Sequence, residues 1–272
     1  MRALKATVTP FWLKQHLSSK NIVVLDARSR TAYSRAHIPG ARSADLFHYF
    51  VPGTDRKNLR VFQHDLESKL GRLGLRGDEK TVVYESGFGM RAARVAWMLE
   101  YAGISSPSML EGGFRAWQDS KYPIEKKRRL VVPTKFKADP DPSVLATIGQ
   151  VRSQSRSQTG LVLDVRTRGE YYGSEKRECC PRSGRIPGSV WLEWTNFLDE
   201  RGGFQNRRSI EKQLRSKGLR HGSDIAVYCH RGARAAAAFY ALRSMGYNKA
   251  KNYVGSWHEW SSKKNLPAES SQ

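Results

Sequence analysis

The sequence predicts an α/β fold made of two copies of one domain, each a parallel sheet covered by helices on both faces. Two observations support this prediction. The chain repeats itself after roughly half its length, and short β-branched runs alternate with helical patterns in each copy. Strands that alternate with helices are typical of parallel sheets, because two parallel strands need a crossover connection between them.

The repeat is visible in four pairs of motifs. Val23–Arg28 matches Leu161–Arg166, His37–Ala41 matches Arg185–Ser189, Val82–Tyr84 matches Ala226–Tyr228, and Gly112–Trp117 matches Gly255–Trp260. The second copy also carries an insert around Gly173–Gly184. Asp26 and Arg28, like Asp164 and Arg166, end predicted buried strands, so we expect two structural ion pairs there.

The elements follow in order along each copy. The strands are predicted at Asn21–Leu25, Lys80–Tyr84, Gly160–Leu163 and Asp224–Tyr228, and the clearest helices at Arg91–Ala102 and Arg234–Met245. Both helices are rich in alanine and are followed by a glycine, Gly103 or Gly246, as a helix C-cap favours. Sites in parallel sheets form at the carboxyl ends of strands, so the loops after Tyr84 and Tyr228 are the candidate sites.

The domain boundary is predicted where the composition changes. Residues 121–132 are basic and contain Pro123, and residues 139–142 alternate aspartate with proline. We therefore expect a first domain at 1–124, a linker at 125–142 and a second domain at 143–272.

The composition narrows the class of protein. The formal net charge of +22 is spread over both copies, which favours a basic surface or the steering of anionic substrates over nucleic-acid binding. Three cysteines exclude a disulfide framework, and no apolar run is long enough to cross a membrane. We expect a monomer without a cofactor, located in the cytoplasm, with the mitochondrial matrix as the alternative.

The loop after Tyr228 contains the candidate catalytic residue. Cys229 follows a predicted buried strand and precedes a helix N-terminus, where backbone N–H groups favour an anion. The candidate substrate-binding residues are His230, Arg231, Gly232, Ala233 and Arg234. Positive side chains and the N–H groups of a tight loop favour the thiolate of Cys229, the nucleophilic form. The sequence thus predicts a nucleophile beside a site for an anionic substrate or leaving group.

The first copy has Glu85 at the position that Cys229 occupies in the second. A carboxylate there can accept hydrogen bonds from the loop but cannot act as a sulfur nucleophile. We therefore expect one active copy and one inactive copy, which serves as scaffold and cleft wall.

Taken together, these motifs resemble the tandem-domain rhodaneses, the family of thiosulfate and 3-mercaptopyruvate sulfurtransferases. The resemblance covers nearly the whole chain and implies two rhodanese-like domains, the first inactive. It implies that Cys229 takes the outer sulfur of thiosulfate, releases sulfite and passes the sulfur from a persulfide to cyanide or a thiol. It also implies that Arg231 contacts thiosulfate and that Arg234 pairs with the leaving sulfite.

The length and content of the Cys229 loop bear on the substrate. Related phosphatases and arsenate reductases carry an arginine at the position of Ala235, so a phosphate-type oxyanion is disfavoured. Mercaptopyruvate enzymes resemble Cys-Gly-Ser-Gly-Val-Thr at this loop, so its two arginines and histidine favour thiosulfate. 3-Mercaptopyruvate is the alternative donor, and a non-catalytic module that binds an anion or a partner is the second alternative.

Three residues of the second copy depart from a simple assignment. Many family members have an arginine that contacts the substrate anion where this chain has Glu170, and Arg168 or Arg177 are candidates to replace it. Cys179 and Cys180 are expected to be exposed thiols, because a disulfide between neighbours is strained. No second Cys-x-x-Cys pair accompanies them, so we expect no metal site.

Overall fold

The computed structural model describes residues 6–87, 89–157, 161–200 and 203–270. It divides into two compact units. The predicted linker groups with the first unit up to Asp141, and the second unit begins its main part at Pro142. The segment Phe50–Leu59 also groups with the second unit. None of the helices in the described ranges combines the length and the apolar character that a membrane crossing requires.

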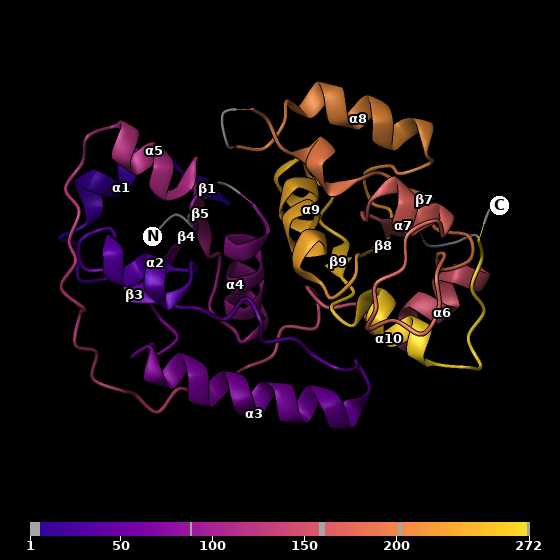
Figure 1. Ribbon diagram of the computed structural model, residues 1–272, viewed down its shortest axis with the longest axis horizontal. Coiled ribbons are helices and arrows are strands. Elements are labelled where there is room, and N and C mark those ends of the chain that lie inside the picture. Colours follow the sequence, from indigo (N-terminus) through magenta and orange to yellow (C-terminus); the bar gives the residue numbers. More distant parts are fainter. Residues whose placement is uncertain (1–5, 88, 158–160, 201–202, 271–272) are drawn as a thin grey trace. The chain divides into compact units, whose positions relative to one another are not determined.

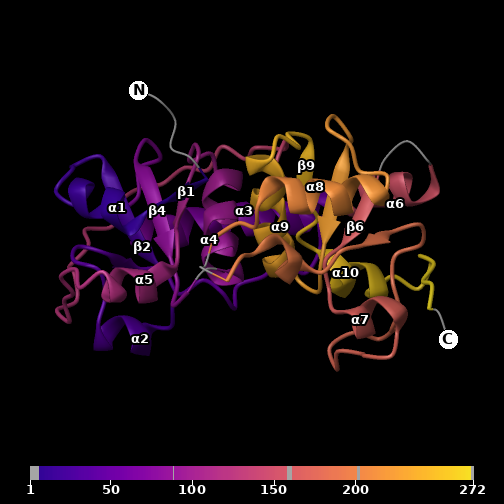
Figure 2. The same ribbon diagram turned by 90° about the horizontal axis from the view of Figure 1, so that it is seen from above.

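The described part of the first unit contains a five-stranded parallel sheet in the order β1-β5-β4-β2-β3. Its strands are β1 (Thr7–Val8), β2 (Ile22–Asp26), β3 (Arg42–Ser43), β4 (Lys80–Tyr84) and β5 (Ser108–Leu110). The helices of this part of the chain are α1 (Pro10–His16), α2 (Arg30–Arg35), α3 (Arg56–Arg72), α4 (Met90–Tyr101) and α5 (Gly113–Asp119). Helices α1 and α4 lie on opposite faces of the sheet in both views (Figures 1 and 2).

The described part of the second unit contains a four-stranded parallel sheet in the order β7-β6-β8-β9. Its strands are β6 (Leu161–Asp164), β7 (Val190–Trp191), β8 (Ile225–Tyr228) and β9 (Ala250–Asn252). Its helices are α6 (Ile148–Arg156), α7 (Arg168–Tyr172), α8 (Arg207–Ser216), α9 (Ala233–Ser244) and α10 (Ser256–Ser262), with a short 3-10 helix at Trp194–Phe197. Helices α6 and α9 lie on opposite faces of this sheet (Figures 1 and 2). The predicted fold class is confirmed in both units.

The two units repeat the same register. Asp26 pairs with Tyr84 across β2 and β4, and Asp164 pairs with Tyr228 across β6 and β8. The predicted strands agree with the observed ones to within one residue, except that Gly160 lies outside the described residues.

The alanine-rich helices α4 and α9 begin one residue earlier than predicted. The chain leaves them through Gly103 and Gly246, whose φ angles are 99° and 94°. This left-handed conformation is easy for glycine and costly for other residues, so these glycines fix both helix ends.

Buried ion pairs end β2 and β6, as the sequence predicts. Arg28 Nη2 lies 2.6 Å from Asp26 Oδ2, and Arg166 Nη2 lies 2.6 Å from Asp164 Oδ2. The Arg166 guanidinium also donates to the carbonyl of Gly184, 2.8 Å away. Each pair therefore anchors the loop at the carboxyl end of a strand, next to the candidate sites.

Candidate active site

The Cys229 loop connects the carboxyl end of β8 to the N-terminus of α9. Strand β8 lies between β6 and β9, so the loop leaves an interior strand of the sheet. Cys229 is only 1% exposed. Ala233 is the first residue of α9. Its side chain is only a methyl group, so its backbone is the part that can bind a substrate. The predicted site residues thus lie together in this loop and the first turn of α9.

The sulfur of Cys229 lies next to a backbone hydrogen-bond donor and a positively charged side chain. The N–H of Gly232 donates to Sγ over 3.1 Å, and the hydroxyl of Ser256 lies 4.0 Å from it. Gly232 has a φ of 81°, and a Cβ there would lie 2.9 Å from the backbone of Val254, so the turn requires glycine. The charge of Arg234 also interacts with Cys229. The Gly232 N–H and the charge of Arg234 both favour negative charge on the sulfur.

Ser256 is a site residue that the sequence analysis missed. Its hydroxyl accepts a hydrogen bond from the Cys229 N–H (3.1 Å) and donates to the carbonyl of Tyr253 (2.8 Å). Its φ of 53° is unusual for a residue with a side chain. The equivalent residue of the first copy is Gly113, where a Cβ would collide with the carbonyl oxygen of Gly87. Comparing the two copies in the sequence could have identified this residue, because one copy has glycine at this left-handed position and the other has serine.

Arg234 forms a buried, two-pronged ion pair with Glu170. Its Nη1 lies 2.6 Å from Glu170 Oε2 and its Nη2 lies 2.9 Å from Oε1. Burial alone would raise the pKa of Glu170, but the hydrogen bonds and charge of Arg234 lower it to about 2. Glu170 is therefore ionised at neutral pH and partly neutralises Arg234. The family resemblance implies that the same arginine pairs with the leaving sulfite.

Glu170 also contacts the insert and caps α7. Arg177 Nε lies 3.4 Å from Glu170 Oε1, although the side chain of Arg177 is about half exposed. The Thr167 N–H donates to Glu170 Oε2, 3.2 Å away, which satisfies the first turn of the helix. Arg168 packs over the ring of Tyr172 instead. Of the two candidates for the missing arginine, Arg177 is thus the one beside Glu170.

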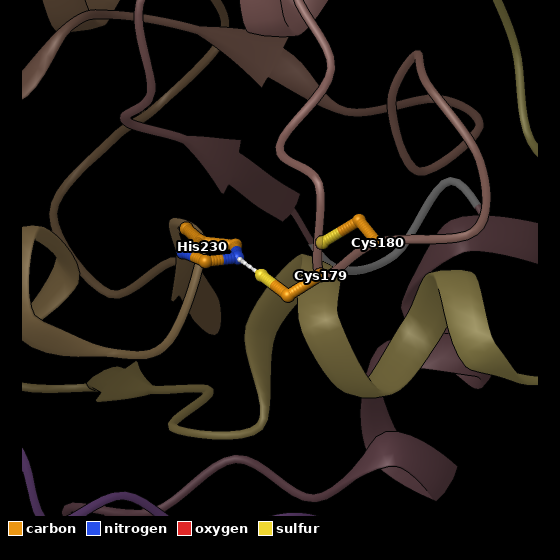
Figure 3. A group of neighbouring side chains, drawn as sticks. All are labelled: Cys179, Cys180 and His230. Carbon is orange, nitrogen blue, oxygen red and sulfur yellow. Dashed lines mark hydrogen bonds between the residues drawn. The ribbon is translucent and has the colours of Figure 1, made fainter.

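His230 points toward the insert. Its Nε2 lies 3.1 Å from the sulfur of Cys179 (Figure 3). Burial and the charge of the adjacent Arg231 lower the pKa of His230 to about 4. The imidazole is therefore uncharged at neutral pH. Sequence spacing gave no sign of this contact, because the two residues are 51 positions apart.

The two cysteines of the insert differ in exposure. Cys179 is exposed, as expected, but the expectation is wrong for Cys180, which is only 1% exposed. The N–H of Cys180 donates to the carbonyl of Arg177 (2.9 Å), and this turn brings its side chain into the hydrophobic core of the second unit.

Arg231 stacks on a residue that is distant in the sequence. Its guanidinium carbon lies 4.1 Å from the centre of the Phe50 ring, a cation–π contact. Phe50 begins the segment that groups with the second unit. Thr54 holds the same segment through hydrogen bonds from its N–H and hydroxyl to Glu259, at 2.6 and 2.8 Å. Nothing in the repeat pattern predicted that this segment borders the site.

The first unit has a carboxylate in the equivalent loop. Glu85 Oε1 accepts hydrogen bonds from the backbone N–H groups of Arg91 (2.8 Å) and Ala92 (3.0 Å). Burial raises the pKa of Glu85. The loop at the start of α4 is therefore an anion-binding turn whose anion is a fixed side chain.

Comparison with known proteins gives the same family for both halves of the chain. The model of the rhodanese-like domain matches residues 9–120 and again residues 147–263. The thiosulfate sulfurtransferase of Azotobacter vinelandii is 28% identical, over 98% of this chain and 98% of its own length. The 3-mercaptopyruvate sulfurtransferase of Escherichia coli (strain K12) is 26% identical, over 95% of each. A probable 3-mercaptopyruvate sulfurtransferase of Pseudomonas aeruginosa is 30% identical, over 91% of this chain and 92% of its own.

Solved structures share the fold. The crystal structure of the anaerobic ergothioneine biosynthesis enzyme from Chlorobium limicola, in complex with trimethyl histidine, superposes with a TM-score of 0.86. It is 22% identical and the match covers 98% of this chain and 70% of that one. At this identity the likeness concerns the architecture of the two domains.

Proposed function

Since this chain belongs to the rhodanese-like family in both of its halves, we propose that it is a thiosulfate sulfurtransferase that works through a persulfide on Cys229. Its named relatives include both thiosulfate and 3-mercaptopyruvate sulfurtransferases, so sulfur transfer is the activity they have in common. The first unit, with Glu85 in its loop, is proposed to be inactive.

The reaction has two displacement steps. In the first, the Cys229 thiolate attacks the outer sulfur of thiosulfate. A sulfur–sulfur bond to Cys229 forms while the bond inside thiosulfate breaks, and sulfite leaves with the electron pair. In the second, cyanide or a thiolate attacks the outer sulfur of the persulfide, and Cys229 leaves as a thiolate again.

The observation that carries this proposal is the setting of the Cys229 sulfur. It is buried at the carboxyl end of an interior strand. It accepts a hydrogen bond of 3.1 Å from the N–H of Gly232, the residue immediately before α9. An N–H donor and a helix N-terminus both stabilise the attacking thiolate and the anionic persulfide. The same donors stabilise the negative charge that develops on the sulfur atoms during transfer.

The side chains of the loop support thiosulfate as the donor. Arg231 and Arg234 bring positive charge to the loop, and the charge of Arg234 reaches Cys229. This arrangement suits a dianion. A second candidate follows from one specific contact: Glu170 neutralises Arg234 and so lowers the net positive charge. 3-Mercaptopyruvate carries a single negative charge, so it requires less positive charge in the site than thiosulfate does.

The test is the intact mass of the protein after incubation with thiosulfate, with Cys229→Ser as the control. We expect the mass of one added sulfur atom in the native chain and none in the variant. A gain with 3-mercaptopyruvate but not with thiosulfate would establish the second candidate instead. A folded protein that gains sulfur from neither donor would refute both, and would leave an anion- or partner-binding module. The cytoplasmic location and the monomeric state stay predictions.

A further inference from the structure

Two cysteines of the insert and one histidine of the active-site loop converge on one point. Cys179 Sγ, Cys180 Sγ and a ring nitrogen of His230 all lie within 4.8 Å of one another (Figure 3). The cysteines come from the loop that the second copy has and the first lacks, and His230 comes from the end of β8. Two distant parts of the second unit thus place three metal-binding atoms together.

The backbone holds the two cysteine sulfurs on the same side. Neighbouring residues in an extended chain point to opposite sides, but here the Cys180 N–H donates to the Arg177 carbonyl and closes a turn. Arg182 then fixes the insert, because its guanidinium donates to the carbonyls of Trp260 (3.0 Å), Ser261 (3.0 Å) and Leu266 (2.6 Å). The indole N–H of Trp257 donates in return to the Arg182 carbonyl, 3.1 Å away. The cluster is therefore built on a fixed loop rather than on a free one.

From this arrangement, we propose that Cys179, Cys180 and His230 form a binding site for one thiophilic metal ion, represented by zinc(II). Two thiolates and an imidazole are ligands that zinc prefers, and three protein ligands leave a fourth position for water or an incoming thiol. Binding would replace the two thiol protons, which pass to solvent, so the ion and two thiolates form a neutral unit. The two steps of the proposed sulfur transfer involve neither cysteine of the insert, although His230 is also a candidate substrate-binding residue.

The distances fit a tetrahedral centre after small side-chain adjustments. Zinc–sulfur and zinc–nitrogen bonds of about 2.3 and 2.0 Å place neighbouring ligand atoms ~3.5–3.8 Å apart. The Cys179 sulfur and the His230 Nε2 are 3.1 Å apart and need to separate slightly, whereas the Cys180 sulfur lies inside 4.8 Å of the other two ligand atoms. Cys179 is exposed, so an ion can enter from solvent. A disulfide between the two cysteines is the less suitable use of these atoms, because a ring between neighbours is strained.

The test is zinc uptake by the full chain, reduced and freed of metal with a chelator, in competition with a zinc-binding dye. Native mass spectrometry counts the bound ions, and cadmium(II) in place of zinc reports sulfur ligation by its ultraviolet charge-transfer absorption. We expect one ion per chain in the native protein. Cys179→Ser and His230→Ala should each weaken binding by more than the ~10–100-fold that loss of an outer-shell partner costs.

Cys229→Ser is the matched control, because it removes the neighbouring thiol and leaves the three ligands in place. It should still bind one ion with unchanged affinity. The proposal is refuted if the native protein takes no zinc from the dye, if Cys179→Ser retains the ion, or if Cys229→Ser loses it. Cys179 is exposed, so its substitution does not disturb the core, and thermal unfolding verifies that each variant is folded.

Discussion

Replacing Glu170 by glutamine removes a buried negative charge that holds Arg234 beside the candidate nucleophile. The pKa of Glu170 is about 2, against an ordinary value of 4.5. That difference corresponds to ~3 kcal/mol of folding stability, since a tenfold change in proton affinity is about 1.4 kcal/mol. A similar loss of folding stability is expected from breaking a buried ion pair by removing one partner, which costs about 3–5 kcal/mol.

The pH dependence has a definite sign. The folded-state pKa of Glu170 is depressed, so the ion pair stabilises the folded protein fully above about pH 4.5, and this contribution is lost as the pH falls toward 2. Denaturant unfolding should therefore show Glu170→Gln to be ~3 kcal/mol less stable than the native chain at pH 7. The difference should shrink below pH 4.5.

The same substitution releases the Arg234 guanidinium for a substrate anion. A hydrogen bond from a charged group contributes about 1.5–3 kcal/mol, and ~1.4 kcal/mol is a factor of ten, so the KM for thiosulfate should fall by at least about tenfold. Steady-state assays with thiosulfate and cyanide measure it.

Glu178→Gln is the matched control for the stability and kinetic effects of Glu170→Gln. It changes the net charge equally at an exposed position of the insert. The role given to Arg234 is wrong if the two variants have the same KM in folded samples. The energetic role of the pair is wrong if Glu170→Gln unfolds at the same denaturant concentration as the native chain.

Three further substitutions test the positioning of the loops. Ser256→Ala removes the hydroxyl that accepts a hydrogen bond from the Cys229 N–H. In steady-state kinetics kcat should fall with KM nearly unchanged, and in denaturant unfolding the stability should drop by about 1 kcal/mol. Gly232→Ala forces a Cβ against the backbone of Val254 at a φ of 81° and should cost at least ~1 kcal/mol in denaturant unfolding. Its persulfide yield by mass spectrometry should fall as well, and native yield would contradict the role of this turn. Glu85→Ala removes the acceptor at the start of α4 and should cost about 1 kcal/mol of stability while the mass gain on Cys229 stays at one sulfur.

The sequence predicted those features that depend on neighbours along the chain. The strands, the alanine-rich helices and the loop at Cys229 all follow from local composition, from glycine positions and from the repeat. The repeat also showed that Glu85 stands in place of the cysteine. Local patterns of this kind are sufficient because a β-strand, a helix and the turn between them are each set by a few consecutive residues.

The contacts that could not be predicted join residues far apart in the sequence. The substitution at Glu170 was visible, but its pairing with Arg234 depends on how α7 packs beside α9. The contact of His230 with Cys179 depends on the path of an insert that the first copy lacks, so the repeat offered no template for it. In each case the candidate site contacts a side chain that spacing alone does not identify.

The two copies place different side chains on one backbone frame, a carboxylate in the first unit and the proposed catalytic thiol in the second. Both have the same backbone frame: the Phe114 N–H donates to the Glu85 carbonyl at 2.7 Å, as the Trp257 N–H donates to that of Cys229 at 3.0 Å. In the first copy the backbone N–H groups at the start of α4 are bound to the carboxylate of Glu85, which cannot be exchanged. In the second copy the Gly232 N–H is bound instead to the sulfur of Cys229, an atom that as a thiolate can form and break a bond to another sulfur. The residue at the end of the strand is thus a fixed carboxylate in the first copy and the proposed nucleophile in the second, and the left-handed position further along is Gly113 in one copy and Ser256 in the other.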